Sequence, residues 1–278
     1  MKASSPAAAK DGTVSAASTN QHQTKGRLFL VPAPLDFACD TQTALQDVMP
    51  LGTLKAASSL AYWICENAKT ARAYLKRVHD VTPLKHTIQE QHLQELPREV
   101  HKKGDFSGVS GAVFDARHLL EPALKGHDMG LISEAGMPAI ADPGASVVRA
   151  AHQLHIPVVP LVGPSSLLLA LAASGLSGQQ FAFVGYLPQD GPERTQKIKA
   201  LEHTALQTGQ TQLFIETPYR NTALLTALLQ TLQGQTLLSV SAGLTLSNAW
   251  QRSATVKEWK TQTVELDKHT PVVFAIGR

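Results

Sequence analysis

Short apolar runs alternate with longer segments of helical periodicity along most of the chain. The run at 27–34, RLFLVPAP, predicts a first strand, and a largely helical region is expected from about Thr41 to Leu96, with its clearest helix at Cys65–Val78. A helix at 114–125, the short strand MGLIS, another helix and the strand IPVVPLV come next. This alternation of strand, turn and helix favours a parallel sheet with helices over both faces.

The second half of the chain carries more strands toward its end. The runs FAFVGYLP, TQLFIETP, TLLSVSAGL, SATVKEW and PVVFAIGR predict strands, and helices are expected at 194–206 and 221–232. The second of these helices is apolar almost all round, which predicts burial, and the clustered strands predict a mixed sheet with antiparallel edges. We therefore expect two α/β domains, 26–162 and 163–278, after a disordered Ala/Ser/Thr-rich tail at 1–25.

Ser133–Gly144, SEAGMPAIADPG, is the most informative segment because it lies between a predicted strand and a predicted helix. Small-residue turns at the carboxyl ends of parallel strands are where α/β proteins bind ligands. Gly136 can take a positive φ without strain, and Asp142 is a candidate N-cap for the next helix. A structural loop explains the same spacing, so this segment alone leaves both interpretations open.

Two further turns join strands to helices. GPSSL places Ser165 and Ser166 at a helix N-terminus, which attracts a carboxylate such as that of a methionine-like group. Simple N-capping is the alternative interpretation. ETPYRN gathers Glu216, Tyr219 and Arg220 at the end of an apolar strand, which suits ligand contacts and equally suits a Glu–Arg pair that ties strand to helix.

Together these blocks resemble the tetrapyrrole methylase family. SEAGMPAIADPG, VVPLVGPSSLLLALAASGL, FAFVGYLP and LFIETPYRN stand in the family's order between Leu131 and about Leu232. The family pattern runs approximately SDAGTPxISDPG, GPSAxxxALxxSGL, FxFxGFLP and ESPxR. The likeness is greatest to its branch of ribosomal RNA small subunit methyltransferase I, which methylates a cytidine ribose 2′-hydroxyl. The opening strand, RLFLVPAPL, is similar to the family's VxTPIGN.

The resemblance implies a homodimer whose subunits hold S-adenosylmethionine (SAM) between two α/β domains. The residues implied for the cofactor pocket are Ser133, Glu134, Ala135, Gly136, Pro138, Ile140, Pro164, Ser165, Ser166, Leu167, Tyr219 and Leu244. If the methyl acceptor is a hydroxyl, a positioned base can remove its proton, and Glu66 and Asp36 are the two candidates. The predicted function is SAM-dependent methylation of RNA, of the ribosomal ribose 2′-O type.

Departures from the family pattern fall on the presumed substrate side. Asp36-Phe37 replaces the Gly-Asn that follows the first strand, ICENAKTAR only loosely matches AEDTR, and Glu134 and Met137 stand in place of Asp and Thr. Two alternatives therefore stay open, a methyltransferase for a small tetrapyrrole and a SAM-binding protein without catalysis. A tetrapyrrole needs a wide apolar trough, which the polar segment PREVHKKGD does not suggest.

Composition narrows the classes of partner. A net charge of +3 permits a nucleic-acid partner without requiring one, and the basic cluster of Arg98, Lys102 and Lys103 is the candidate RNA contact. Cys39 and Cys65 form no CxxC pair, which favours a reducing cytoplasm and no disulfide framework. No apolar run reaches the roughly 18 residues of a membrane span. The eleven histidines show no HExxH or similar spacing, so no metal site is expected.

Overall fold

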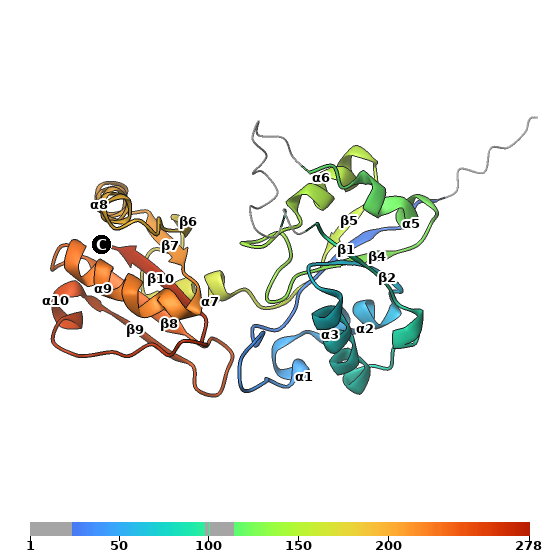
Figure 1. The fold of residues 1–278 in the computed structure, drawn as a ribbon, viewed down its shortest axis with the longest axis horizontal. Coiled ribbons are helices and arrows are strands. Elements are labelled where there is room, and N and C mark those ends of the chain that lie inside the picture. Colours follow the sequence, from blue (N-terminus) through green and yellow to red (C-terminus); the bar gives the residue numbers. More distant parts are fainter. Residues whose placement is uncertain (1–23, 98–99, 101–113) are drawn as a thin grey trace, which may run out of the picture.

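The computed structural model describes residues 24–97, 100 and 114–278, and within them it shows two α/β units, each built on a five-stranded sheet (Figure 1). The first sheet has the order β3-β2-β4-β1-β5, and its strands run parallel. They are β1 Leu28–Val31, β2 Tyr62–Cys65, β3 His92–Glu95, β4 Met129–Ile132 and β5 Val158–Pro160. The predicted parallel α/β architecture is therefore confirmed.

Helices cover both faces of this first sheet because successive side chains of a strand point to opposite faces. Trp63 of β2 belongs to a core with α2 and α3, while the next residue, Ile64, belongs to a second core with η2 and α6. The helical elements of this unit are α1 Leu45–Val48, α2 Leu51–Ser59, α3 Ala68–Val81, η1 Ile88–Glu90, η2 Arg117–Leu120, α5 Glu121–Leu124 and α6 Ala145–Gln153.

The prediction of a largely helical region from Thr41 to Leu96 is wrong in part, because this region also contains the strands β2 and β3. Three of the four residues of β2 are buried, and all four are apolar or aromatic, so the strand shows no alternation. A short apolar run of this kind cannot be told from a helix by periodicity. The helix expected at Cys65–Val78 begins three residues later. The Asn67 side chain caps it by accepting hydrogen bonds from the backbone N–H groups of Lys69 and Thr70.

The second sheet has the order β6-β7-β10-β8-β9 and is mixed, as predicted. The expectation that its edges are antiparallel holds at β9 and is wrong at β6, which pairs in parallel with β7. Its strands are β6 Phe181–Tyr186, β7 Thr211–Ile215, β8 Leu237–Ala242, β9 Trp250–Thr255 and β10 Val272–Gly277. The edge pair β6–β7 is parallel, and the other pairs are antiparallel. The accompanying helical elements are α7 Ser166–Ser174, α8 Gly191–Thr208, η3 Pro218–Arg220, α9 Asn221–Thr231 and α10 Val256–Trp259.

Two expectations for this second unit need correction. The predicted strand SATVKEW ends at Thr255, where a capping box with Glu258 begins α10. The helix expected to be buried all round, α9, buries one face through Asn221, Leu224 and Leu228, while threonine and alanine side chains on its other face are exposed. Threonine is mostly exposed in folded proteins, and a single exposed small apolar side chain is ordinary at a protein surface.

The link between the two units runs from β5 to α7 and contains Gly163, the proposed domain boundary. A Cβ atom at Gly163 would lie 2.2 Å from Cγ of Pro32, so this close approach requires glycine. Of the proposed tail at 1–25, residues 1–23 lie outside the described part of the chain, and Lys25 donates a hydrogen bond to the carbonyl of Leu154. No helix in the described ranges is both long and apolar enough to cross a membrane.

Candidate active site between the two units

A cavity of about 380 Å³ lies where loops from the two sheets meet, and we call it the cleft. Its walls come from the loops after β1 and β4, from the N-terminus of α7, from the ends of β6, β7 and β8, and from the start of β10 with the loop before it. The lining residues are Leu35, Phe37, Ala38, Ala135, Gly136, Met137, Ile140, Ala141, Asp142, Ser165, Ser166, Leu167, Tyr186, Ile215, Glu216, Thr217, Pro218, Ser241, Gly243, Leu244, His269, Pro271, Val272 and Val273.

The loop after β4 has an unusual backbone conformation at the cleft. Gly136 has φ +71°, the positive value that the sequence suggested, and its N–H and carbonyl pair with the carbonyl and N–H of Ala33 at 3.0 and 2.9 Å. Ala139 and Ala141 also have a positive φ of 64°. Left-handed backbone costs roughly 1 kcal/mol or more per residue outside glycine, and such strain concentrates at ligand sites.

The second turn ends in the N-terminus of α7. Ser165 is the N-cap residue, yet its side chain makes no capping hydrogen bond within the described residues. Simple capping therefore does not explain the hydroxyl, and Ser165 and Ser166 both line the cleft. The N-terminal N–H groups and helix dipole of this nine-residue helix favour an anionic group at this position.

The third turn contains the Glu–Arg pair that the sequence left open as one alternative. Arg220 donates from Nη2 and Nε to Glu216 Oε1 at 2.7 and 3.0 Å, and the backbone N–H of Thr217 donates to the same oxygen at 2.7 Å. The pair ties the end of β7 to the start of α9. Tyr219 lies beside the Arg220 guanidinium and is exposed outside the cleft lining.

The twelve residues proposed for the cofactor pocket divide into three groups. Those that line the cleft are Ala135, Gly136, Ile140, Ser165, Ser166, Leu167 and Leu244. Ser133 and Glu134 line a neighbouring cavity instead. Pro138, Pro164 and Tyr219 line neither cavity.

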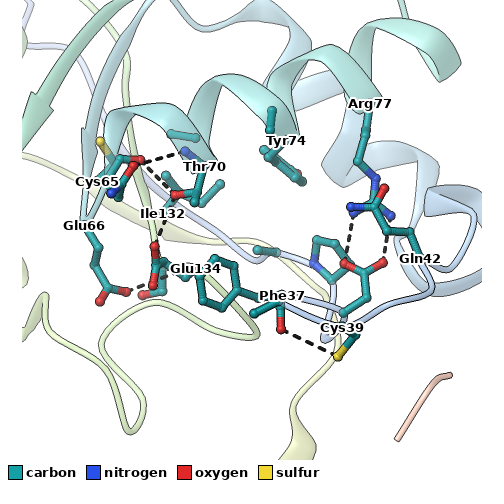
Figure 2. A pocket seen from close by; sticks show the side chains of 18 residues that line it. Phe37, Cys39, Gln42, Cys65, Glu66, Thr70, Tyr74, Arg77, Ile132 and Glu134 are labelled. Carbon is teal, nitrogen blue, oxygen red and sulfur yellow. Dashed lines mark hydrogen bonds and ion pairs between the residues drawn. The ribbon is translucent and has the colours of Figure 1, made fainter. Parts of the chain in front are cut away.

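This neighbouring cavity, the side pocket, measures about 280 Å³ and lies at the carboxyl ends of β1, β2 and β4 (Figure 2). Phe37 and Ala38 line both it and the cleft, so the two cavities share a wall. The side pocket is lined by Ala33, Pro34, Asp36, Phe37, Ala38, Cys39, Gln42, Cys65, Glu66, Asn67, Thr70, Ala71, Ala73, Tyr74, Arg77, Ile132, Ser133 and Glu134.

Asp36, one of the two predicted bases, is held in a buried ion pair. Its side chain is 3% exposed, and its two oxygens accept hydrogen bonds from Arg77 at 2.9 and 2.8 Å. The Arg77 guanidinium also donates to the carbonyl of Thr43, whose N–H donates to Asp36. Since both oxygens are occupied by a guanidinium, the geometry points away from proton transfer and toward a structural role, which corrects the expectation for Asp36.

Glu66, the other predicted base, follows β2 and lines the side pocket. Its Oε1 accepts a hydrogen bond from the backbone N–H of Glu134 at 3.2 Å, which joins the ends of β2 and β4. The Glu134 carboxylate accepts one from the Thr70 hydroxyl at 3.3 Å. Glu66 therefore stays a candidate, placed beside a second carboxylate.

Asp142 is the residue that sequence reasoning missed. Burial and the charges of Glu66 and Glu134 raise its pKa to about 7, and it lines the cleft. The expectation that Asp142 caps α6 is wrong, because Gly144 is the N-cap, with φ +133°. No local pattern marks the raised pKa of Asp142, since it depends on burial, on Glu66 after β2 and on Glu134 earlier in the same loop.

Other predicted features stay untested or outside the described residues. Arg98, Lys102 and Lys103 lie among the residues that the structure does not describe. Within the described ranges, no group of three or more His, Cys, Asp or Glu side chains could hold a metal ion.

Comparison with known proteins assigns the family. A sequence model of the Tetrapyrrole (Corrin/Porphyrin) Methylases matches residues 53–259. The chain belongs to this family. Ribosomal RNA small subunit methyltransferase I of Halalkalibacterium halodurans is 31% identical over 205 residues, which cover 73% of this chain and 59% of the relative. The protein of the same name from Mesorhizobium japonicum is 31% identical over 231 residues, covering 83% and 67%. The predicted resemblance is thus confirmed.

Two solved structures of methyltransferases share the fold. The methyltransferase CobJ superposes with a TM-score of 0.55 at 16% identity, covering 91% of this chain and 94% of that one. The native form of uroporphyrin III C-methyl transferase from Thermus thermophilus gives 0.51 at 16% identity, covering 91% and 98%. The chain spans about three fifths of the length of the first curated relatives that it matches.

Proposed function

We propose that this tetrapyrrole methylase family member is a SAM-dependent methyltransferase that acts on RNA. The cleft carries the cofactor assignment. Most of its wall is apolar, as an adenosyl group requires, and the α7 N-terminus with Ser165 and Ser166 suits the methionine carboxylate. Ser241 in the same wall is 1% exposed, and its hydroxyl has no hydrogen-bond partner among the described residues. A polar group of the ligand can supply that hydrogen bond.

RNA is supported as acceptor by the curated relatives, whose shared name specifies ribosomal RNA of the small subunit. Bound SAM supplies a methyl group whose bond to sulfur breaks as its bond to the acceptor oxygen forms. The protein's own residues must hold the acceptor in line and exclude water, because positioning is the main source of rate in such a displacement.

Asp142 is the best-supported base for an acceptor hydroxyl. A general base is most effective when its pKa lies near the working pH, and burial together with Glu66 and Glu134 raises the pKa of Asp142 to about 7. Asp142 lines the cleft, while Glu66 and Glu134 line the side pocket and lie close enough for their charges to act on Asp142. The acceptor proton would pass to Asp142 as the new carbon–oxygen bond forms.

A homodimer in the cytoplasm completes the proposal. Val162, Leu168 and Leu169 are exposed in and just before α7, and a second copy of the chain would remove these apolar side chains from water. Light scattering at working concentration is expected to report twice the chain mass, and a monomer would contradict this part.

Calorimetry with S-adenosylhomocysteine tests the cofactor assignment. Ser241→Ala should weaken binding by about 5- to 10-fold, since one hydrogen bond is worth about 1 kcal/mol, without lowering the free energy of unfolding. Ser239→Ala, on the same strand but outside the cleft, is the matched control and should leave affinity unchanged. Equal affinity of wild type and Ser241→Ala would place the cofactor elsewhere.

Methyl transfer from labelled SAM tests the acceptor. Protein-free small-subunit ribosomal RNA and a porphyrinogen are offered separately to the wild-type chain. Incorporation into RNA alone is expected, incorporation into the porphyrinogen alone would make the chain a small-molecule enzyme, and tight SAM binding without transfer to either would favour a non-catalytic SAM-binding protein.

A further inference from the structure

The side pocket contains two buried hydroxyl groups that the protein leaves unsatisfied. Tyr74 is 6% exposed and Ser133 is 5% exposed, and neither Tyr74 Oη nor Ser133 Oγ has a hydrogen-bond partner in the described part of the chain. A buried polar atom without a partner costs about 1–3 kcal/mol, and native proteins rarely leave such groups without a reason. Both residues line the same cavity, so one bound molecule can satisfy both.

The surrounding groups make the side pocket a shaped polar site. Thr70, Tyr74 and Arg77 lie three or four residues apart on α3 and therefore share one face of the helix, which Figure 2 shows along the upper wall. Ser133 directly follows β4 and lines the same cavity. Burial raises the pKa of the Tyr74 hydroxyl, which keeps it protonated and able to donate at neutral pH.

Phe37 adds an aromatic surface at the wall shared with the cleft. Its side chain is 40% exposed although it is large and apolar, and it lines both cavities. Exposed aromatic rings are the usual stacking surface for unpaired bases. The loop that carries Phe37 is anchored on both sides of the ring. Asp36 is bound by Arg77, and the Thr43 hydroxyl donates to the carbonyl of Thr245 in the second unit.

The size of the side pocket limits the ligand. A volume of about 280 Å³ is just below the usual range for small-molecule sites of roughly 300–1,000 Å³, so it suits one base with its ribose better than a macrocycle. A molecule in the side pocket also lies next to the cleft across Phe37 and Ala38, which is where a methyl acceptor must be.

We propose that the side pocket receives a single nucleoside turned out of the RNA strand, stacked on Phe37 and hydrogen-bonded by Tyr74 and Ser133. This inference rests on the proposed function and names the form in which RNA is presented. Enzymes that modify one nucleotide commonly extrude it into a fitted pocket and hold it by stacking and by edge hydrogen bonds. The ribose then points across the shared wall toward the cleft.

Nucleotide binding tests the pocket independently of catalysis. The full chain saturated with S-adenosylhomocysteine is titrated with each of the four ribonucleoside 5′-monophosphates by calorimetry. At least one nucleotide should bind with a dissociation constant in the millimolar range or below. Tyr74→Phe and Phe37→Ala should each lower the affinity for that nucleotide at least 5-fold. Tyr62→Phe removes the same hydroxyl from a tyrosine outside the side pocket and should change nothing. If no nucleotide binds, or if the variants bind as wild type does, the proposal fails.

Two further readouts separate a direct contact from a structural effect. Tyr74→Phe should leave the affinity for S-adenosylhomocysteine and the melting temperature unlowered, because it removes an unsatisfied hydroxyl and leaves the ring in the core. It should raise the KM for RNA about 5-fold or more, and a lower melting temperature with unchanged KM would overturn the assignment. Methylation of RNA without nucleotide binding refutes the pocket alone. Nucleotide binding without methylation of RNA refutes the proposed function alone.

Discussion

Replacing Asp142 by asparagine tests both the electrostatics and the chemistry of the cleft. Asparagine has nearly the same shape and no titration, so Asp142→Asn removes the charge and leaves the packing. Burial, followed by the charges of Glu66 and Glu134, raises the pKa of Asp142 from its ordinary value of 3.8 to about 7. The folded protein therefore holds a proton on this carboxyl over a pH range in which the unfolded chain has lost it.

The sign and size of the effect follow from proton linkage. Between pH 4 and 7 the folded state binds more protons than the unfolded state at this residue, so stability falls as pH rises through that window. The interval from 3.8 to about 7, at about 1.4 kcal/mol per pH unit, gives about 4 kcal/mol at most. Asp142 is only partly buried, and water screens its charge, so we expect about 2 kcal/mol.

Urea unfolding at a series of pH values measures this difference. The free energy of unfolding of Asp142→Asn should equal that of wild type near pH 4 and exceed it by about 2 kcal/mol above pH 7. Asp47→Asn, at an exposed aspartate on α1, is the control and should track wild type throughout. A stability difference that is the same at pH 4 and at pH 8 would refute the reasoning.

The same variant tests the proposed base. The wild-type kcat/KM for methyl transfer should rise with pH, with a midpoint near 7, because the free enzyme must carry ionised Asp142. Asp142→Asn should lower kcat/KM about 100-fold or more, and its pH profile should no longer show the midpoint near 7. A variant that keeps the wild-type profile would return the role to Glu66.

Two other variants address the supports of the site. Arg77→Met should lower the free energy of unfolding in urea by about 3–5 kcal/mol, because it leaves the buried Asp36 without its counter-charge. Adding Asp36→Asn should recover part of that loss. A loss below about 1 kcal/mol would contradict a buried ion pair. Gly136→Val should lower the free energy of unfolding by about 1–3 kcal/mol because of the positive φ rather than a clash, and it should abolish binding of S-adenosylhomocysteine in calorimetry. Gly136→Ala should show both effects to a smaller extent. Normal binding by the valine variant would mean that the cofactor does not contact this loop.

The sequence predicts those parts of the site whose cause is local. Gly136 has positive φ because its neighbours along the chain form a tight turn, and Ser165 lies at a helix N-terminus because a strand and an apolar helix flank it. The parallel sheet follows from the alternation of elements in the same way. Local sequence preferences of this kind agree with the global fold in natural proteins, so they can be predicted from the sequence.

What the sequence misses depends on contacts between distant segments. Asp142 looks like a helix cap until the ends of β2 and β4 bring Glu66 and Glu134 near it. Asp36 looks like a base until α3 places Arg77 on both of its oxygens. The unsatisfied hydroxyl of Tyr74 has no signature at all, because the residue has the helical spacing of an ordinary core position.

The departures from the family pattern favour an active enzyme over an eroded one. Asp36-Phe37 stands where the pattern has Gly-Asn, and a buried carboxylate introduced without compensation would cost several kcal/mol. Here Arg77 compensates it with a bidentate pair, and the neighbouring ring of Phe37 lies at the wall between cleft and side pocket. In this chain the buried Asp36 therefore has a counter-charge, and Phe37 places an aromatic ring between the two cavities. We therefore expect the difference from the relatives to lie in which nucleotide is methylated, rather than in whether methyl transfer occurs.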